Sequence, residues 1–370
     1  MSKKINIIQR SHFSRRDFLK VVSLATGAIG TTLILPGCGQ QTESSKTEYT
    51  SGMVDTTGYK KDPPYVIVRS GMGEVNSWQA MATLHFDYAT KEVFKDKFKE
   101  VYTASAFFDP AQQVADIEDL MTHNPDVMII TPVSGGNCVA QIEAAMDQGI
   151  PVILPGARAY TNKYISYIDR DNNAVGLMYA DWVAQQIGGK GKVAIMMGLP
   201  GNTYAEDVLR GTREGLAKYP DIEEVGLVYG HWSPVDAKTE MEALLAKGTQ
   251  IDGIINDGGN MAIGIIDAYL DAGLPIPPLG GDDSNGFLRK AKEHDVKFVA
   301  PYPSGNEATY DAVETAVKVL SGEPVVKNVL KEIKSFTNEG LDKYYRPDLS
   351  DQYWTVNKLS EDWIDKNFKE

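Results

Sequence analysis

Short apolar runs alternate with longer amphipathic stretches along most of this chain, and this alternation limits its possible folds more than any other feature. The runs expected as strands are 65–69, 126–131, 152–154, 193–197, 225–229, 253–256 and 298–300. The stretches expected as helices lie near 110–123, 137–148, 204–219, 235–247, 260–272 and 305–320. Continuous apolar strands separated by helices predict parallel sheets covered on both faces. Because one sheet of all these strands would be unusually large, we expect an α/β fold of two doubly wound, Rossmann-like lobes.

Length and charge agree with two soluble lobes. A chain of 370 residues usually divides into two domains. Its formal net charge is -13, and residues 1–38 contribute +5, which leaves -18 for the remainder. An acidic body repels nucleic acid phosphates, so we expect no nucleic acid partner.

Two cysteines, Cys38 and Cys138, are too few for a disulfide framework or a cysteine-based zinc site, and we expect no metal or cofactor.

The N-terminal residues are typical of targeting rather than of a folded domain. Residues 14–20 read SRRDFLK and resemble the twin-arginine export signal, with Arg15 and Arg16 as the arginine pair. The apolar stretch 21–35 that follows is too short and too weakly apolar for a comfortable bilayer span of ~20 residues. We therefore interpret residues 1–38 as a signal peptide, with an uncleaved N-terminal anchor as the alternative.

A lipid anchor is expected at the end of the apolar stretch. Residues 35–38 read LPGC and resemble a lipobox, in which Cys38 carries the lipid and becomes the mature N-terminus. Pro36 departs from the usual small residue or valine, and an ordinary cleaved signal with an incidental cysteine is the alternative. Residues 39–61 are rich in Gln, Thr, Ser and Gly, and they are interpreted as a flexible tether.

Candidate ligand contacts follow the ends of the expected strands, where doubly wound sheets bind their ligands. The loops there carry aromatic and charged side chains, namely Trp78, Arg158, Glu206, Trp232, Asp257, Asp282 and Tyr302. Aromatic faces cover the C–H side of a sugar ring, while carboxylates and arginine bind hydroxyl groups in directed pairs. This combination predicts a polyhydroxylated ligand.

Several passages at these loops resemble the type I periplasmic sugar-binding proteins, close to their ribose-binding branch. The passages are NPDVMIITP at 124–132, AAMDQGIP at 144–151, GKGKV at 189–193, GLPG at 198–201, AKYPDI at 217–222, YGHW at 229–232 and GGDDSNGF at 280–287. The resemblance spans about residues 65–356.

The resemblance implies two lobes that are joined by a hinge of three crossovers and that close on the ligand. We expect the crossovers near Asp169, Ser304 and Lys334. The expected divisions are an N-terminal lobe of 62–169 plus 304–333, a C-terminal lobe of 170–303 plus 334–358, and a C-terminal tail of 359–370. Residues 344–354 resemble the C-terminal extension of this subfamily and are expected to form a strap packed on the lobes.

The resemblance also implies roles for the aromatic and amide residues. Trp78 and Trp232 stand where the family has ring-stacking aromatics, and a core tryptophan is the alternative for Trp78. Asn76 either contacts the ligand or caps a helix, and Gln79 is a further candidate on the same turn. Arg158 stands where the family usually has an Asp-Arg pair, although the aspartate is missing and the loop is one residue longer; a surface arginine is the alternative.

Four more residues remain as candidate contacts. Glu206 occupies the position of a ligand-binding arginine in the ribose-binding pattern, which disfavours ribose in its usual pose; a first-turn helix glutamate is the alternative. Asp282 matches the hydroxyl-binding aspartate of the family, with a helix N-cap as its alternative. Asp257 aligns loosely, and Tyr302 is either a hinge residue or a ligand contact.

Together these features predict an exported, lipid-anchored solute-binding protein. It would be a monomer that captures a monosaccharide or sugar-like polyol and delivers it to an ABC transporter permease. The alternative is a sensor module that presents a ligand to a receptor, with autoinducer-2-like molecules among its ligands. A sugar-modifying enzyme is the remote alternative, because the sequence has no Walker loop, no His-Glu-x-x-His and no Gly-x-Ser-x-Gly elbow.

Overall fold

The computed structural model describes residues 52–369, which belong to one compact unit. The predicted signal residues Arg15 and Arg16 and the predicted lipidation site Cys38 lie outside the described residues, so these predictions stay open. Within residues 52–369, no helix combines the length and apolar character needed to cross a bilayer.

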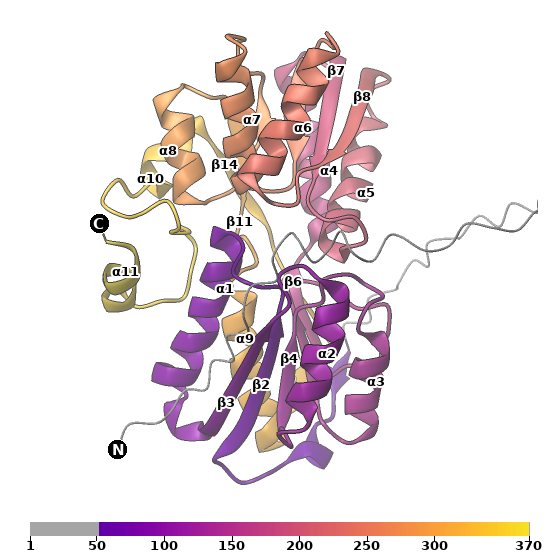
Figure 1. Cartoon of the computed structure of the whole chain (residues 1–370), viewed down its shortest axis with the longest axis vertical. Helices are drawn as coiled ribbons and strands as arrows, with labels where there is room; N and C mark the ends of the chain where they lie inside the picture. Colours follow the sequence, from indigo (N-terminus) through magenta and orange to yellow (C-terminus); the bar gives the residue numbers. More distant parts are fainter. Residues whose placement is uncertain (1–51, 370) are drawn as a thin grey trace, which may run out of the picture. The chain divides into compact units, whose positions relative to one another are not determined.

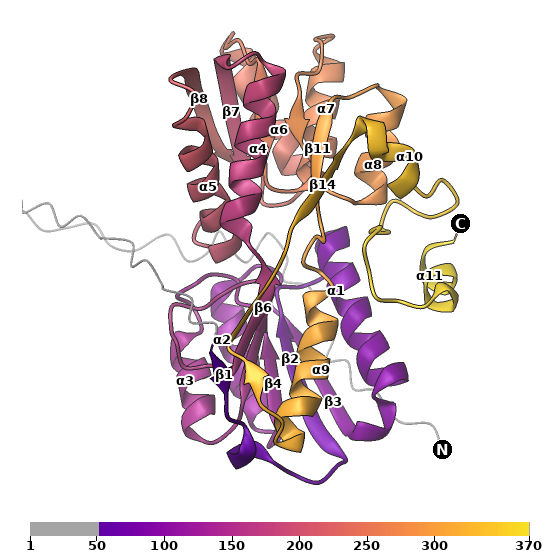
Figure 2. The same ribbon diagram turned by 180° about the vertical axis from the view of Figure 1, so that it is seen from behind.

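The N-terminal lobe is built on a parallel sheet with the strand order β13-β6-β5-β4-β2-β3 (Figures 1 and 2). Its strands are β2 (Tyr65–Gly71), β3 (Phe98–Ser105), β4 (Val127–Ile130), β5 (Val152–Pro155), β6 (Ser166–Arg170) and β13 (Asn328–Lys331). Its helices are α1 (Ser77–Tyr88), α2 (Pro110–Met121), α3 (Val139–Asp147) and α9 (Ala308–Ser321).

Apolar side chains project from both faces of this sheet, as the continuous apolar runs of its strands predict. Ile67 and Ile129 pack with Phe86 and Val313 of α1 and α9 on one face. Their neighbours Val68 and Met128 pack on the other face, against side chains of α2 and α3. Successive side chains of a strand point to opposite faces, so an unbroken apolar run requires helices on both sides.

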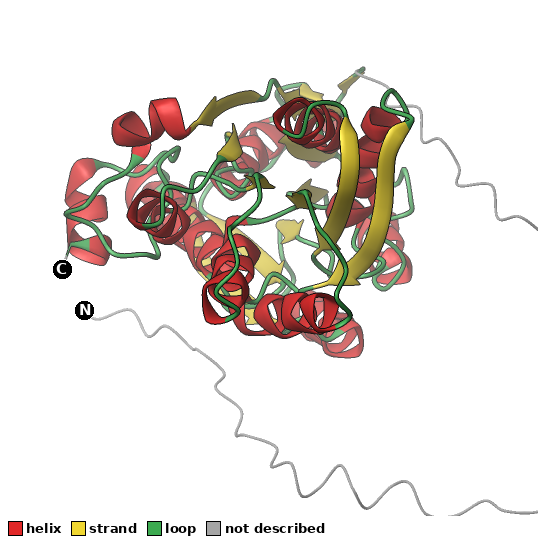
Figure 3. Cartoon of the chain, turned by 90° about the horizontal axis from the view of Figure 1, so that it is seen from above, coloured by secondary structure: helices red, strands yellow, loops and turns green. Residues whose placement is uncertain are grey.

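The C-terminal lobe repeats this plan with the strand order β14-β11-β10-β9-β7-β8. Its strands are β7 (Lys190–Met197), β8 (Asp221–Tyr229), β9 (Gly253–Asn256), β10 (Leu279–Gly280), β11 (Phe298–Tyr302) and β14 (Lys334–Thr337), and only the β11–β14 pair is antiparallel among these strands of residues 52–369. Its helices are α4 (Asn172–Gln186), α5 (Thr203–Leu216), α6 (Pro234–Ala246), α7 (Gly259–Asp271), α8 (Asn285–Glu293) and α10 (Leu341–Tyr344). Seen from above, helices lie to both sides of the strands (Figure 3).

The chain passes between the two sheets at three places. It leaves the N-terminal sheet after β6 to enter α4, returns after β11 to enter α9, and leaves again between β13 and β14. Figure 2 shows β6, β11 and β14 at the junction of the two lobes. The sequence-based prediction of two α/β lobes with largely parallel sheets is confirmed.

The two ends of the described chain differ from the sequence-based expectation of a tether and a tail. Within the expected tether 39–61, β1 (Met53–Val54) pairs with β12 (Val325–Val326), and the side chain of Thr56 is buried. Within the expected tail 359–370, α11 (Glu361–Phe368) buries Ile364 and Phe368 against other apolar side chains. Both segments are polar in composition, and a few well-placed contacts still order them.

Candidate ligand-binding site

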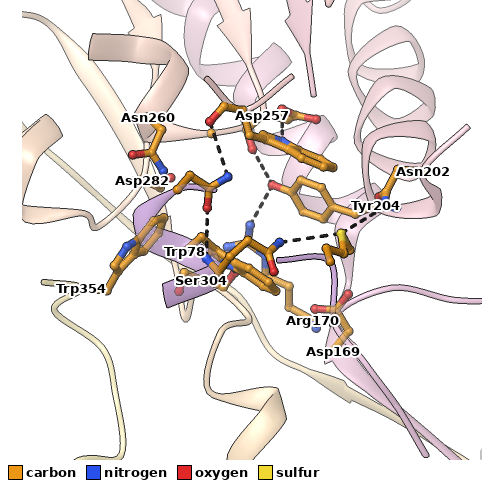
Figure 4. Close-up of a pocket in the computed structure, with 16 residues that line it drawn as sticks. Trp78, Asp169, Arg170, Asn202, Tyr204, Asp257, Asn260, Asp282, Ser304 and Trp354 are labelled. Atoms are coloured by element: carbon orange, nitrogen blue, oxygen red, sulfur yellow. Dashed lines mark hydrogen bonds between the residues drawn. The ribbon is translucent and has the colours of Figure 1, made fainter. Parts of the chain in front are cut away.

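A cavity lies between the two lobes, where loops follow the carboxyl ends of the strands (Figure 4). It is lined by Met72, Asn76, Trp78, Gln79, Gly156, Asp169, Arg170, Asn202, Tyr204, Trp232, Asp257, Gly258, Asn260, Asp282, Ser304 and Trp354. Six of the sequence-predicted contact residues are in this set: Asn76, Trp78, Gln79, Trp232, Asp257 and Asp282. Their contact with a ligand stays a prediction.

Trp78 is held in the first turn of α1. Asn76 is the N-cap of this helix, and its side chain accepts a hydrogen bond of 3.0 Å from the backbone N–H of Gln79. The indole N–H of Trp78 donates to the backbone oxygen of Ser304, which fixes the ring. A Cβ at Gly156 would lie 3.0 Å from the indole, so glycine lets the neighbouring loop approach the ring closely. Asn76 therefore both caps the helix and lines the cavity.

Trp232 is also held in place, by contacts within the C-terminal lobe. Its backbone has a φ of 51°, a left-handed conformation that is uncommon for a bulky residue and that clusters at functional sites. A Cβ at Gly198 would lie 1.9 Å from the indole, so the ring can lie there only because that residue is glycine. The indole N–H donates to Asp257 Oδ1 at 2.9 Å. The ring is therefore fixed before any ligand arrives.

Two buried carboxylates reach the cavity from the ends of β9 and β10. Asp257 also accepts from the backbone N–H of Gly198 at 3.1 Å, yet burial raises its pKa from 3.8 to about 7. Asp282 accepts from the backbone N–H groups of Gly259 and Ser284, and burial raises its pKa as well. A carboxylate deprived of water gains from hydroxyl groups that donate to it, so both sites favour a hydroxylated ligand.

Arg170 brings a buried positive charge to the same cavity. Its guanidinium donates to the backbone oxygen of Pro303 at 2.8 Å and to the hydroxyl of Tyr204 at 3.0 Å. Burial acts to lower its pKa, but the facing oxygens of Tyr204, Tyr179 and Asp169 outweigh burial and raise it. The guanidinium therefore adds a buried cation to the lining of the cavity.

The lobes touch each other around the cavity. The amide of Asn202, which also caps α5, donates across the cleft to the backbone oxygen of Val133 at 3.0 Å. The backbone N–H of Gly135 donates to the oxygen of Gly201 at 3.0 Å. These bonds join loops of opposite lobes, so the described arrangement has the cleft closed.

Two predicted contacts, Arg158 and Glu206, do not line the cavity formed by residues 52–369. Arg158 forms an ion pair with Asp207 of the opposite lobe, and both side chains are largely buried. Glu206 is exposed and accepts a hydrogen bond of 2.5 Å from the hydroxyl of Tyr160, again across the cleft. Residues two apart on a helix are turned by about 200°, so Tyr204 faces the cavity while Glu206 faces away from it. Both predicted residues therefore join the lobes at the rim.

Tyr302 also lies outside the cavity. It ends β11, and its ring centroid is 6.0 Å from that of Phe336 and 5.3 Å from that of Tyr344. The sequence left Tyr302 as either a hinge residue or a ligand contact, and this packing supports the role of a hinge residue.

The sequence analysis missed several residues that the structure brings to the cavity. The Asp169-Arg170 dipeptide supplies the guanidinium that was expected from Arg158. This dipeptide could have been recognised in the sequence as an Asp-Arg pair at the end of the short run 166–170. That run forms β6, a strand that was not predicted. Trp354 and Asn260 gave no usable signal, because one lies in the C-terminal extension and the other inside a predicted helix.

This arrangement suits reversible binding of a small neutral polyol. Two fixed indoles supply flat apolar faces, and the carboxylates and guanidinium supply acceptors and a donor. Among residues 52–369, no group of three or more His, Cys, Asp or Glu side chains is placed to hold a metal ion.

Comparison with known proteins gives a consistent result. A model of the periplasmic binding protein domain matches residues 76–324. The xylitol-binding protein of Mycolicibacterium smegmatis is 26% identical over 245 residues, which cover 66% of this chain and 70% of that protein. The ribose import binding protein of Haemophilus influenzae is 29% identical over 233 residues, which cover 61% of this chain and 77% of that protein.

Solved structures show the same fold. An ABC transporter solute-binding protein from Bacillus halodurans with bound myo-inositol matches with a TM-score of 0.69 and 24% identity. The match covers 77% of this chain and 98% of that protein. A match at this level of identity shows that the two proteins share a fold, and it does not identify the ligand of this chain.

Proposed function

The chain belongs to the periplasmic binding protein family, and we propose that it captures a monosaccharide or sugar-like polyol between its lobes for an ABC import permease. Its relatives are solute-binding proteins rather than enzymes, and membership in the family implies a location outside the cytoplasm. The ligand and the permease are parts of the proposal.

The single observation that carries the ligand class is the pairing of two fixed indoles with two buried carboxylates in one cavity. Trp78 and Trp232 come from opposite lobes, so a flat ring between them would contact both lobes at once. Asp257 and Asp282 are acceptors whose burial favours ligand hydroxyl groups, while Arg170 adds a guanidinium to the same cavity. A monosaccharide or cyclic polyol offers both kinds of surface.

Closure of the lobes is the proposed basis of delivery. The lobes would be 62–169 plus 304–333 and 170–303 plus 334–358, moving about the three crossovers. A ligand that touches both lobes favours the closed form because it binds that form better than the open one. A closed form differs in shape from an open one, and a permease could recognise it for that reason.

Export and anchoring complete the proposal. The twin-arginine signal and Cys38 would place the folded protein on the outer side of a membrane, held by lipid and a short linker. Because β1 begins at Met53, the linker would be shorter than the 39–61 expected from sequence.

Calorimetry with D-ribose, xylitol and myo-inositol tests the ligand class on the protein lacking residues 1–38. We expect at least one of these polyols to bind with a measurable heat and to raise the unfolding temperature. Uptake of that polyol by cells should then require both this protein and an ABC permease. Binding without any loss of uptake in a deletion strain would favour the sensor alternative, and no binding by any polyol would contradict the proposal.

A further inference from the structure

The C-terminal strap, defined here as residues 346–369, is attached to both lobes and reaches the cavity. In the C-terminal lobe, the backbone N–H of Val356 donates to Asp283 Oδ2 at 2.9 Å. In the N-terminal lobe, the backbone N–H of Lys358 donates to His85 Nε2 at 3.1 Å. Figures 1 and 2 both show the strap beside α1 and α8. It lies beyond residues 76–324, the part of the chain that matches the family model.

Trp354 of the strap begins a chain of two hydrogen bonds that ends in the cavity. Its indole N–H donates to Ser77 Oγ at 3.0 Å, and Ser77 Oγ donates to Asn260 Oδ1 at 3.1 Å. The three residues come from the strap, from α1 and from α7, so the chain joins both lobes to the strap. Trp354 and Ser77 are each 2% exposed, so water does not compete for these bonds.

The direction of these bonds follows from the chemistry of the indole. An indole N–H only donates, so the Ser77 oxygen must accept from it. The hydroxyl hydrogen of Ser77 is then free to donate to Asn260, which requires the carbonyl side of that amide. The NH2 of Asn260 is thereby left as a donor at the cavity wall, and no partner for it is found among residues 52–369.

We propose that the strap is part of the binding site, with Trp354 acting through Ser77 to hold Asn260 as a hydrogen-bond donor to a ligand oxygen. This inference rests on the proposed function. Asp257 and Asp282, when charged, only accept hydrogen bonds, so they can pair with ligand hydroxyl groups that donate. A ring oxygen, or a hydroxyl oxygen whose hydrogen is already given to a carboxylate, needs a donor, and Asn260 supplies one. Trp354 also adds a third indole to the cavity wall.

Calorimetry on two variants tests the proposal, using whichever of D-ribose, xylitol and myo-inositol binds the wild-type protein most tightly. Trp354→Phe keeps an aromatic ring and removes the N–H, and Ser77→Ala removes the hydroxyl with little change of volume. Each variant should weaken binding roughly tenfold, because a poorly oriented amide leaves a ligand oxygen without its partner. Trp363→Phe is the control, since Trp363 lies on the same strap, packs beside Tyr88 and does not line the cavity.

A double-mutant cycle separates positioning from a general structural effect. In the Asn260→Ala background, Trp354→Phe and Ser77→Ala should cost no further affinity, because the amide that they orient is gone. A full additional loss there, or unchanged affinity in both single variants while the wild type binds, would overturn the role of the strap and leave the proposed function standing. Failure of the wild type to bind any of the three polyols would instead count against the proposed function. Ser77→Ala keeps the test decisive if Trp354→Phe does not fold.

Discussion

The rim of the cleft carries an ion pair that should control ligand affinity without touching the ligand. Arg158 of the N-terminal lobe pairs with Asp207 of the C-terminal lobe. The backbone N–H of Arg158 also donates a hydrogen bond to Thr203 Oγ1 at 2.8 Å, which is a second contact between the two lobes beside the ion pair. We predict that Arg158→Ala weakens the closed form and therefore weakens ligand binding.

The size of the effect follows from the burial of the pair. The side chains of Arg158 and Asp207 are 11% and 5% exposed, and removing one partner of a buried pair costs ~3–5 kcal/mol when the other charge stays buried. Here the cost is smaller, because Asp207 keeps Arg210 at 2.8 Å and regains water when the lobes open. We expect ~1–3 kcal/mol against closure, which corresponds to about 5- to 150-fold in Kd.

Calorimetry and solution scattering together check this prediction. Arg158→Ala should raise Kd for the bound polyol, and the radius of gyration of the ligand-free variant should be at least that of the wild type. Arg213→Ala is the matched control, because Arg213 pairs with Glu224 inside one lobe. In an Asp207→Asn background, Arg158→Ala should cost little more. An unchanged Kd in Arg158→Ala would refute the reasoning that this pair stabilises the closed form.

Five further predictions concern single residues or one residue pair. Trp78→Ala should weaken every accepted ligand by ~2–4 kcal/mol in calorimetry, because a buried aromatic anchor is lost, and equal affinity would remove Trp78 from the site. Affinity should fall as the pH drops through about 7, since burial raises the pKa of Asp257 to about 7 and its charged form accepts ligand hydroxyls; Asp257→Asn should abolish this dependence. The same raised pKa stabilises the ligand-free fold below pH 3.8, and this contribution is lost as the pH rises through about 7. Cys38→Ala should release the protein from membranes in cell fractions, and a variant that stays bound would contradict lipidation. Replacing both Arg15 and Arg16 by Lys should block export, and normal export would rule out the twin-arginine route.

The periodicity of the sequence predicted the sheet strands that lie in the middle of each lobe. β4 and β9 are buried on both faces, so their apolar runs are continuous and easily recognised. β3 was not among the predicted strands, because it is an edge strand whose residues after the buried Phe98 are exposed or half-buried and form no continuous apolar run. Its place in the sheet depends on pairing with β2, which local sequence does not report.

The site was predicted in part for a similar reason. Trp78, Trp232 and Asp282 follow strand ends, and the rule for parallel sheets places such residues at one edge. Glu206 and Arg158 also follow strand ends, but the turn of α5 and the course of the loop direct them to the rim, where they bond across the cleft.

The sequence by itself determined the fold class, the edge of each sheet where a ligand would bind, and the polyol-like chemistry of that edge. These depend on local patterns, namely the period of apolar residues and the residue types that follow each strand. Only the tertiary structure decided which side chains share the cavity. Arg170, Asn260 and Trp354 are far apart in the chain, and they meet because two lobes and a strap fold against one another. Convergence of that kind depends on packing between distant elements, and no local pattern records it.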